Sequence, residues 1–177
     1  MKKTQGGQKP CLRNPQSQMR EINFYIDAYS KGVSDFDCGF EVFNSYLKNH
    51  SDKSVIHYVV DSESDKLIAY FAVIASGLLR GDPENLNIIP AIELKMFALD
   101  KSYQNIGITS SLLNAVFNAI EYFAREFVGA DVILLYSVPV EHVLSLYKTE
   151  GFQKVEGLFT AFKDPFTEGC IPMFKFI

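Results

Sequence analysis

Apolar residues divide most of the chain into short runs, and seven of these runs favour β-strands. Their composition is rich in valine, isoleucine and aromatic residues, which is typical of strands. Alanine and aromatic residues throughout the third run indicate a strand that is buried on both faces. The seven runs are residues 21–29, 54–60, 66–76, 91–100, 131–138, 152–163 and 171–177.

Three other stretches place apolar residues three and four positions apart, which predicts amphipathic helices. Asp35 or Asp37 is a candidate cap for the first helix. Gly129 marks the end of the second, while Pro139 and Gly151 bound the third. The apolar stripes are Phe40, Phe43, Tyr46 and Leu47; then Leu112, Leu113, Val116, Phe117, Ile120, Phe123 and Phe127; then Val140, Val143, Leu144 and Tyr147.

The connections complete a mixed α/β pattern. The polar segment "DSESD" separates the second and third strands and predicts a hairpin. Residues 77–90, which carry Gly81 and Pro83, are expected to form a loop that helps to line the acceptor site. Residues 1–20 lack any apolar period and are expected to be a flexible tail, followed by a single domain over residues 21–177.

Composition and charge exclude several classes of protein. The chain has 177 residues, of which 47% are apolar, and its three distant cysteines form no disulfide or zinc pattern. The longest apolar run is too short to cross a bilayer and no signal peptide is visible, so we expect a cytoplasmic protein. After residue 20, 12 basic residues face 21 acids, and this net charge of −9 opposes nucleic-acid binding.

The segment "QNIGIT", residues 104–109, stands between a strand and the longest helix. Such a junction exposes unpaired backbone N–H groups at the positive end of a helix dipole, where phosphate binds well. An ordinary tight turn is the simpler interpretation of one glycine in this place. The segment lacks the lysine of a Walker loop and the second glycine of a dinucleotide fingerprint.

The surrounding residues "LKMFALDKSYQNIGITSSLL" resemble the acyl-CoA-binding motif of the GNAT superfamily of N-acetyltransferases. A second stretch, "VLSLYKTEGFQKV", resembles that family's later signature, with Tyr147, Gly151 and Phe152 in the matching places. The resemblance covers residues 21 to 177 and implies the GNAT fold, a twisted, mostly antiparallel sheet of six to seven strands with about four flanking helices. It implies acetyl-CoA as co-substrate, held by Phe97, Ala98, Leu99, Gln104, Asn105, Ile106, Gly107, Ile108, Thr109 and Ser110.

One branch of that family is more similar still. "DFDCGFEVFNSYLKN" and "IPAIELKMFALDKSYQNIG" resemble GNAT proteins related to the toxins of toxin–antitoxin pairs. Toxins of this branch acetylate the amino group of aminoacyl-tRNA, so the resemblance implies tRNA and a small antitoxin as candidate partners.

The loop departs from the family pattern in two ways. Thr109 stands where the family has glycine or alanine, and its branched side chain could crowd a pyrophosphate or donate a hydrogen bond to it. The loop also lacks lysine and arginine. Phosphate binding would then depend on backbone N–H groups, with Lys101 and Lys148 as the candidate cations.

The resemblance also implies catalytic roles. Tyr147 would protonate the departing thiolate, the alternative being a core tyrosine. Backbone N–H groups around Phe97 to Leu99, freed by a bulge, would polarise the thioester, and Glu93 matches a position where some relatives carry a general base. His57 and His142 fall in no motif, and a structural or surface role fits them better. No metal site is expected, because the histidines lack ligand spacing.

Three functions remain open. The first is an acetyl-CoA-dependent N-acetyltransferase acting on a small-molecule or protein amine. The second is a toxin-like enzyme acting on aminoacyl-tRNA, and the third is a binding or regulatory GNAT-fold protein without catalysis. Residues 171–177 fit either a homodimer contact or a buried strand of the monomer.

Overall fold

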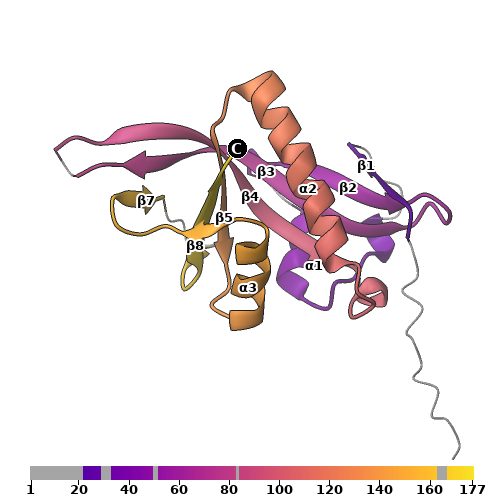
Figure 1. The fold of residues 1–177 in the computed structure, drawn as a ribbon. Coiled ribbons are helices and arrows are strands. Elements are labelled where there is room, and N and C mark those ends of the chain that lie inside the picture. Colours follow the sequence, from indigo (N-terminus) through magenta and orange to yellow (C-terminus); the bar gives the residue numbers. More distant parts are fainter. Residues whose placement is uncertain (1–21, 29–32, 50–51, 83, 163–166) are drawn as a thin grey trace, which may run out of the picture.

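The computed structural model describes residues 22–28, 33–49, 52–82, 84–162 and 167–177. The expected tail, residues 1–20, lies outside these residues. Within them, one twisted sheet forms the centre of the molecule, as Figure 1 shows. None of the described helices has the length and apolar character needed to cross a membrane.

The described part of the chain contains eight strands in one sheet, in the order β1-β2-β3-β4-β5-β8-β6, with β7 paired to β3. All of its strand pairs are antiparallel except β4 with β5, which is parallel. The strands are β1 Phe24–Asp27, β2 Val55–Asp61, β3 Leu67–Arg80, β4 Asn87–Leu99, β5 Val132–Ser137, β6 Gln153–Lys154, β7 Phe159–Ala161 and β8 Ile171–Phe176.

Helices cover both faces of this sheet (Figure 1). Helix α2, Thr109–Phe123, and helix α3, Glu141–Thr149, share one apolar core with the sheet. Helix α1, Glu41–Asn49, packs on the opposite face in a second core. The 3₁₀ turns η1 and η2 span Val33–Asp35 and Lys101–Tyr103, and a π-helical turn, η3, spans Ala124–Val128.

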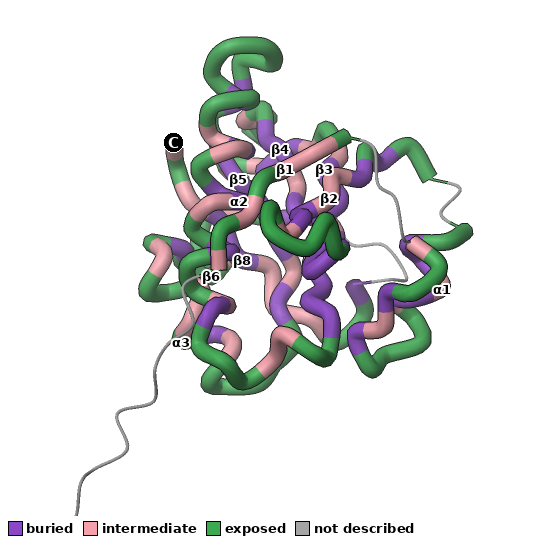
Figure 2. The backbone as a smooth tube through the Cα atoms, turned by 90° about the vertical axis from the view of Figure 1, so that its right-hand side faces the viewer, coloured by how far each residue is buried: buried purple, intermediate pink, exposed green. Residues whose placement is uncertain are grey.

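The mixed, mostly antiparallel sheet confirms the expected fold class, with two differences in number. The described residues form three α-helices rather than about four. They form eight strands rather than six to seven, because the run 152–163 folds into two short strands separated by a turn at Gly157. The third run is buried on both faces from Leu67 to Val73, as expected, and Figure 2 shows this burial along the centre of the sheet.

The expected loop over residues 77–90 is wrong for most of its length. Strand β3 continues to Arg80 and β4 begins at Asn87, so that the two form a long hairpin with a short turn. Leu78 is fully buried because β7 pairs with this end of β3 and covers it. The turn takes Gly81 at φ 125°, a conformation that favours glycine.

Two expectations about helix ends are also wrong. Phe123 and Phe127 do not extend the buried stripe of α2: both rings are exposed, and the next fully buried residue after Ile120 is Ala124, at the start of the π-helical turn. Gly129, at φ 70°, ends this segment as expected. Neither Asp35 nor Asp37 caps α1; instead, the carbonyl of Phe40 accepts from the N–H of Asn44.

Strand β8 is part of the sheet of the monomer. It lies between β5 and β6 in the sheet, and both Met173 and Phe174 are buried. Residues 171–177 are therefore mostly an internal strand of the monomer. The same strand order leaves β4 and β5 side by side at the centre, where the candidate site lies.

Candidate active site

The two central strands separate at a β-bulge in β4. Leu94 pairs with Val73 and Met96 pairs with Ala72, so Lys95 is the extra residue of the bulge. The parallel pairing of β4 with β5 also ends at Leu94, opposite Leu135. Beyond this point the strands no longer pair, and a cavity of about 340 Å³ lies between them.

The cavity brings together four elements of the fold and the segment that leads into β8. Apolar side chains form most of its wall, and Lys95 supplies its one charged group among the described residues. None of the described residues among 77–90 lines it, and their expected place at the acceptor site stays a prediction. The lining residues are Val42, Phe43, Leu94, Lys95, Met96, Phe97, Leu135, Tyr136, Ser137, Val138, Val143, Tyr147, Thr167 and Cys170.

The ladder of β3 and β4 shows which backbone groups face this cavity. The N–H of Asp100 donates to the carbonyl of Ile68, so this pair is a hydrogen-bonded one. Alternation along an antiparallel ladder then turns the backbone of Ala98 toward β3 and the backbone groups of Phe97 and Leu99 away from it. The Leu99 carbonyl is consistent with this orientation, because it accepts a hydrogen bond from the Gln104 side chain, which lies outside the ladder. The Phe97 N–H therefore points to the side where β5 has separated.

Tyr147 reaches the same cavity from α3. Its ring lies edge-on to Phe117 and Phe152, with centroid distances of 6.4 Å and 6.0 Å. Burial raises the pKa of Tyr147 to about 12. Its hydroxyl makes no hydrogen bond to another described residue, so a polar group capable of donating a proton stands in an apolar wall.

The loop 104–108 joins β4 to α2 in a conformation that exposes its backbone. Asn105 and Gly107 have φ angles of 60° and 84°. Within the described chain, the N–H groups from Asn105 to Ser111 donate to no other residue, and α2 directs its positive dipole end toward them. The loop is anchored by Ile108, which is 8% exposed and packs in the core below. Its exposed N–H groups can bind an anion.

The individual loop residues have different roles. Ile106 is exposed over the surface of the loop, and Thr109 and Ser110 form the first residues of α2. The side-chain amide of Gln104 is hydrogen-bonded within the protein. Its amide Nε2 donates to the carbonyls of Cys38 and Leu99, at 2.9 Å and 2.8 Å. The Gln104 side chain therefore holds the loop against β4.

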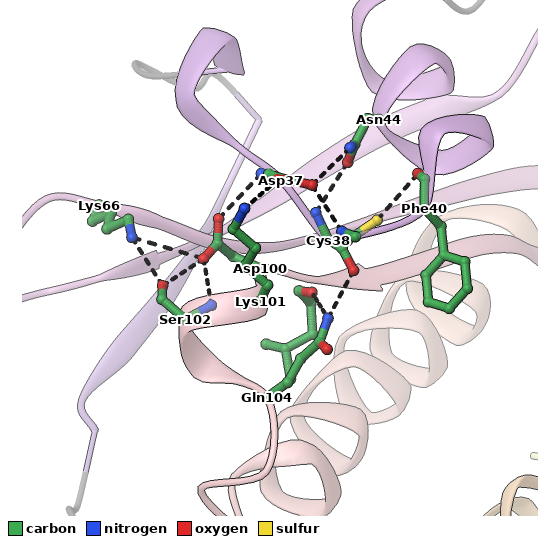
Figure 3. A network of polar contacts seen from close by, with 11 residues as sticks. Asp37, Cys38, Phe40, Asn44, Lys66, Asp100, Lys101, Ser102 and Gln104 are labelled. Atoms are coloured by element: carbon green, nitrogen blue, oxygen red, sulfur yellow. Dashed lines mark hydrogen bonds and ion pairs between the residues drawn. The ribbon is translucent and has the colours of Figure 1, made fainter.

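The "FDCG" segment, residues 36–39, helps to hold the start of this loop through a network of polar contacts, as Figure 3 shows. Asp37 accepts from the Gly39 N–H, from Asn44 and from Lys101, the last at 2.6 Å. Its own N–H donates to Asp100. Hydrogen bonds from Lys101, Asn44 and Gly39 hold the pKa of Asp37 well below its usual range. Sequence resemblance identified this segment, and the structure shows that it binds the end of β4.

Asp100 links the same network to β3. It caps η2 by accepting from the N–H and hydroxyl of Ser102, and Lys66 lies 3.7 Å from its carboxylate. Although burial opposes it, these contacts lower the pKa of Asp100. A nearly fully buried carboxylate thus stabilises the turn from which the loop departs.

The two candidate cations for a phosphate have partners elsewhere. Lys101 is bound to Asp37, and Lys148 lies 3.8 Å from Glu141 on the exposed face of α3. The structure therefore leaves the backbone N–H groups as the main anion-binding groups of the loop.

The remaining candidate residues lie apart from Tyr147. Glu93 is on the face of the sheet opposite α2, between Ile74 and Leu134, and accepts from Ser76 at 3.2 Å. His57 stacks on Phe71 in a separate cavity of about 200 Å³, where burial lowers its pKa. His142 is exposed on α3.

Sequence reasoning missed several lining residues, chiefly Lys95. Its signal was present as a lysine inside an otherwise apolar strand run, but nothing in the sequence marks a bulge. In the described chain no three His, Cys, Asp or Glu side chains are grouped to hold a metal ion.

Comparison with known proteins now adds to this geometry. No family model matches the chain, and no curated protein matches it in sequence. Solved structures do match. A bacterial toxin has a TM-score of 0.67 at 19% identity, with 88% of this chain and 92% of that chain covered. The chain has the GNAT fold.

Two further neighbours are complexes of the toxin AtaT. A tyrosine-to-phenylalanine variant of AtaT, bound to the C-terminus of the antitoxin AtaR and acetyl-CoA, has a TM-score of 0.62 at 19% identity, covering 88% of this chain and 92% of that chain. AtaT complexed with acetyl-methionyl-tRNAfMet has a TM-score of 0.60 at 21% identity, covering 80% and 95%. At these identities the likeness is one of fold.

Proposed function

We propose that the protein is an acetyl-CoA-dependent N-acetyltransferase. The observation that carries this proposal is the cavity between β4 and β5, where the Phe97 strand segment and Tyr147 both lie. Strand β4 leads from this cavity to the exposed N–H groups of loop 104–108 within a few residues. A site for a polarised carbonyl and a site for a phosphate are thus joined by one strand.

The proposed reaction gives each group a separate task. The acceptor amine attacks the thioester carbonyl, and the Phe97 N–H donates to the oxygen on which negative charge develops. The carbon–sulfur bond then breaks, and Tyr147 donates its proton to the departing thiolate. A pKa of about 12 keeps Tyr147 protonated at neutral pH, ready for this step.

The amine must also lose a proton, and we propose Glu93 as the group that receives it through water. Glu93 does not line the cavity, so in this proposal it does not contact the amine directly. It is only partly buried, which leaves its carboxylate accessible to the water that carries the proton. Loop residues Asn105 to Ser110 hold the pyrophosphate through backbone N–H groups in this proposal. Gln104 supports the loop rather than touching the ligand.

A second candidate acceptor is the amino group of an aminoacyl-tRNA. It is favoured by the "FDCG" network and by the neighbour AtaT, whose structure contains acetyl-methionyl-tRNAfMet. The net charge of −9 after residue 20 argues against strong binding of a tRNA backbone. If this acceptor is correct, an antitoxin partner and a cytoplasmic location follow from the same proposal.

Binding and transfer assays test these alternatives in order. Isothermal calorimetry with acetyl-CoA, CoA and ATP measures whether the loop binds CoA selectively. Mass spectrometry then detects acetylation in a panel of free amines, peptides and charged tRNA. Binding without transfer to any of them would favour the non-catalytic function, and absence of acetyl-CoA binding would refute the proposal.

A further inference from the structure

Lys95 is the residue at which β4 leaves its register with β3 and ceases to pair with β5. A lysine is an unusual choice for this place, because its charged end must find a partner when the side chain is buried. The Lys95 side chain is 14% exposed and forms part of the cavity wall. Its ammonium lies 3.2 Å from the carboxylate of Asp52.

Asp52 is held in place independently of Lys95. It lies between α1 and β2, and it accepts from the Tyr46 hydroxyl at 2.8 Å and from the Ser54 N–H at 3.0 Å. The Ser54 hydroxyl donates to it as well. Tyr46 and Ser54 are both buried. The lysine at the bulge is therefore bound to a fixed point on the neighbouring layer.

This arrangement does not serve stability in an obvious way. The pair is only partly buried, since the Asp52 side chain is 30% exposed, and a pair of this kind commonly adds little net stability because desolvation and solvent screening offset the attraction of the two charges. Its geometric effect is larger, because it fixes the direction of one side chain and so the local backbone. At Lys95 the backbone concerned is the bulge, and the Phe97 N–H follows two residues later.

We propose that Lys95, through its ion pair with Asp52, is a positioning residue that aims the Phe97 N–H at the thioester oxygen. The inference rests on the proposed acetyltransferase function. Lys95 touches no reacting atom in this proposal. It holds the strand that carries the donor, and its loss allows the backbone of the bulge and the residues that follow it to shift.

The test measures polarisation of the thioester directly. Acetyl-CoA labelled with ¹³C at the acetyl carbonyl is bound to the protein, and the carbonyl stretch is recorded by infrared difference spectroscopy. In the parent, the stretch moves to lower frequency than in water-free solvent. In Lys95→Met, which keeps most of the length of the side chain and removes its charge, the stretch returns toward the unpolarised value while acetyl-CoA affinity changes less than about threefold.

Rate measurements and a control complete the design. We expect Lys95→Met to lower kcat about 10- to 100-fold, as a small misplacement does, with little change in KM for acetyl-CoA. Lys48→Met, at an exposed position of α1, is the matched control. Asp52→Asn removes the charge of the other partner in the ion pair. The loss of kcat in the double variant should be no larger than the larger of the two single losses.

Each outcome decides between the two proposals. A parent that does not bind acetyl-CoA overturns the proposed function and this inference with it. A parent that binds and polarises the thioester, beside a Lys95→Met variant with an unchanged stretch and kcat, overturns the positioning role alone. If Lys95→Met does not fold, Asp52→Asn with unchanged stretch and rate overturns it equally.

Discussion

Replacement of Tyr147 by phenylalanine separates catalysis from packing at the cavity. The change removes one hydroxyl and keeps the ring, which lies edge-on to Phe117 and Phe152. Because that hydroxyl has no hydrogen-bond partner among the described residues, no contact within them is lost. The variant should therefore keep its fold while it loses a proton donor.

The two effects have opposite signs. A hydroxyl left without a partner costs about 1–3 kcal/mol when buried, and since Tyr147 is only partly buried we expect its removal to stabilise the protein by about 1 kcal/mol. In a chain of this size that raises the thermal midpoint by about 2–4 °C. Loss of general-acid catalysis should lower kcat by about 10²–10⁴, or about 2.7–5.5 kcal/mol in the barrier.

The assay follows thiol release from acetyl-CoA in the presence of an acceptor, together with thermal unfolding and acetyl-CoA binding for both proteins. The pH dependence gives an independent check. Burial raises the pKa of Tyr147 to about 12, so the parent should keep its donor, and its rate should not decline, as pH passes through 10. Because the folded-state pKa is the higher one, the stability that this proton contributes is present below pH 10 and is lost as pH rises toward 12.

A different result would refute this reasoning. A variant that turns over at the parent rate but unfolds at a lower temperature would identify Tyr147 as a core tyrosine. A variant that no longer binds acetyl-CoA would place the hydroxyl in ground-state binding rather than in proton transfer.

Four further substitutions test other parts of the site. Gly107→Val should abolish acetyl-CoA binding, since a φ of 84° disfavours valine and its side chain blocks approach to the loop N–H groups; calorimetry measures this, and retained affinity would contradict it. Gln104→Ala should lower unfolding stability by about 1–2 kcal/mol and weaken acetyl-CoA binding, because two carbonyls lose their donor; denaturant titration tests it. Glu93→Gln should reduce kcat and remove the acid limb of the rate profile, whereas an unchanged profile would exclude Glu93 as the base. Asp52→Asn should make the free energy of unfolding less sensitive to acid pH. Burial alone would raise the pKa of Asp52, but hydrogen bonds from Ser54, Tyr46 and Lys95 lower it overall. The stability that the Asp52 carboxylate contributes is therefore present above about pH 4 and is lost as pH falls.

The sequence predicted strands and helices correctly where an element is buried on one face or on both. The stripe from Leu112 to Ile120 and the buried run of β3 both follow directly from periodicity. The long hairpin was not readable, because residues 77–90 contain Gly81 and Pro83, which look like loop residues. This part of β3 pairs with β4 on one side and with β7, more than 70 residues later, on the other.

The candidate site, too, could be predicted from the sequence only in part. Tyr147 and the loop were proposed as site residues from the sequence, because motif resemblance carries short-range patterns well. The side-chain role of Gln104 was not, since its partners include Cys38, which is 66 residues away. Lys95 was not proposed, because a lysine in a largely apolar run does not show its role alone, and the exact place of a bulge depends on the pairing of two strands.

These long-range contacts have one feature in common. The segment around α1 binds β4 at two places, through Asp52 at the bulge and through Asp37 and Cys38 beyond the strand's end. The first contact precedes the Phe97 N–H, and the second holds the loop that offers its N–H groups to a phosphate. A ligand that spans both sites requires a fixed distance and angle between them. Binding of β4 at its bulge and of the residues just beyond its end to one neighbouring segment gives this precision without a side chain in contact with the ligand.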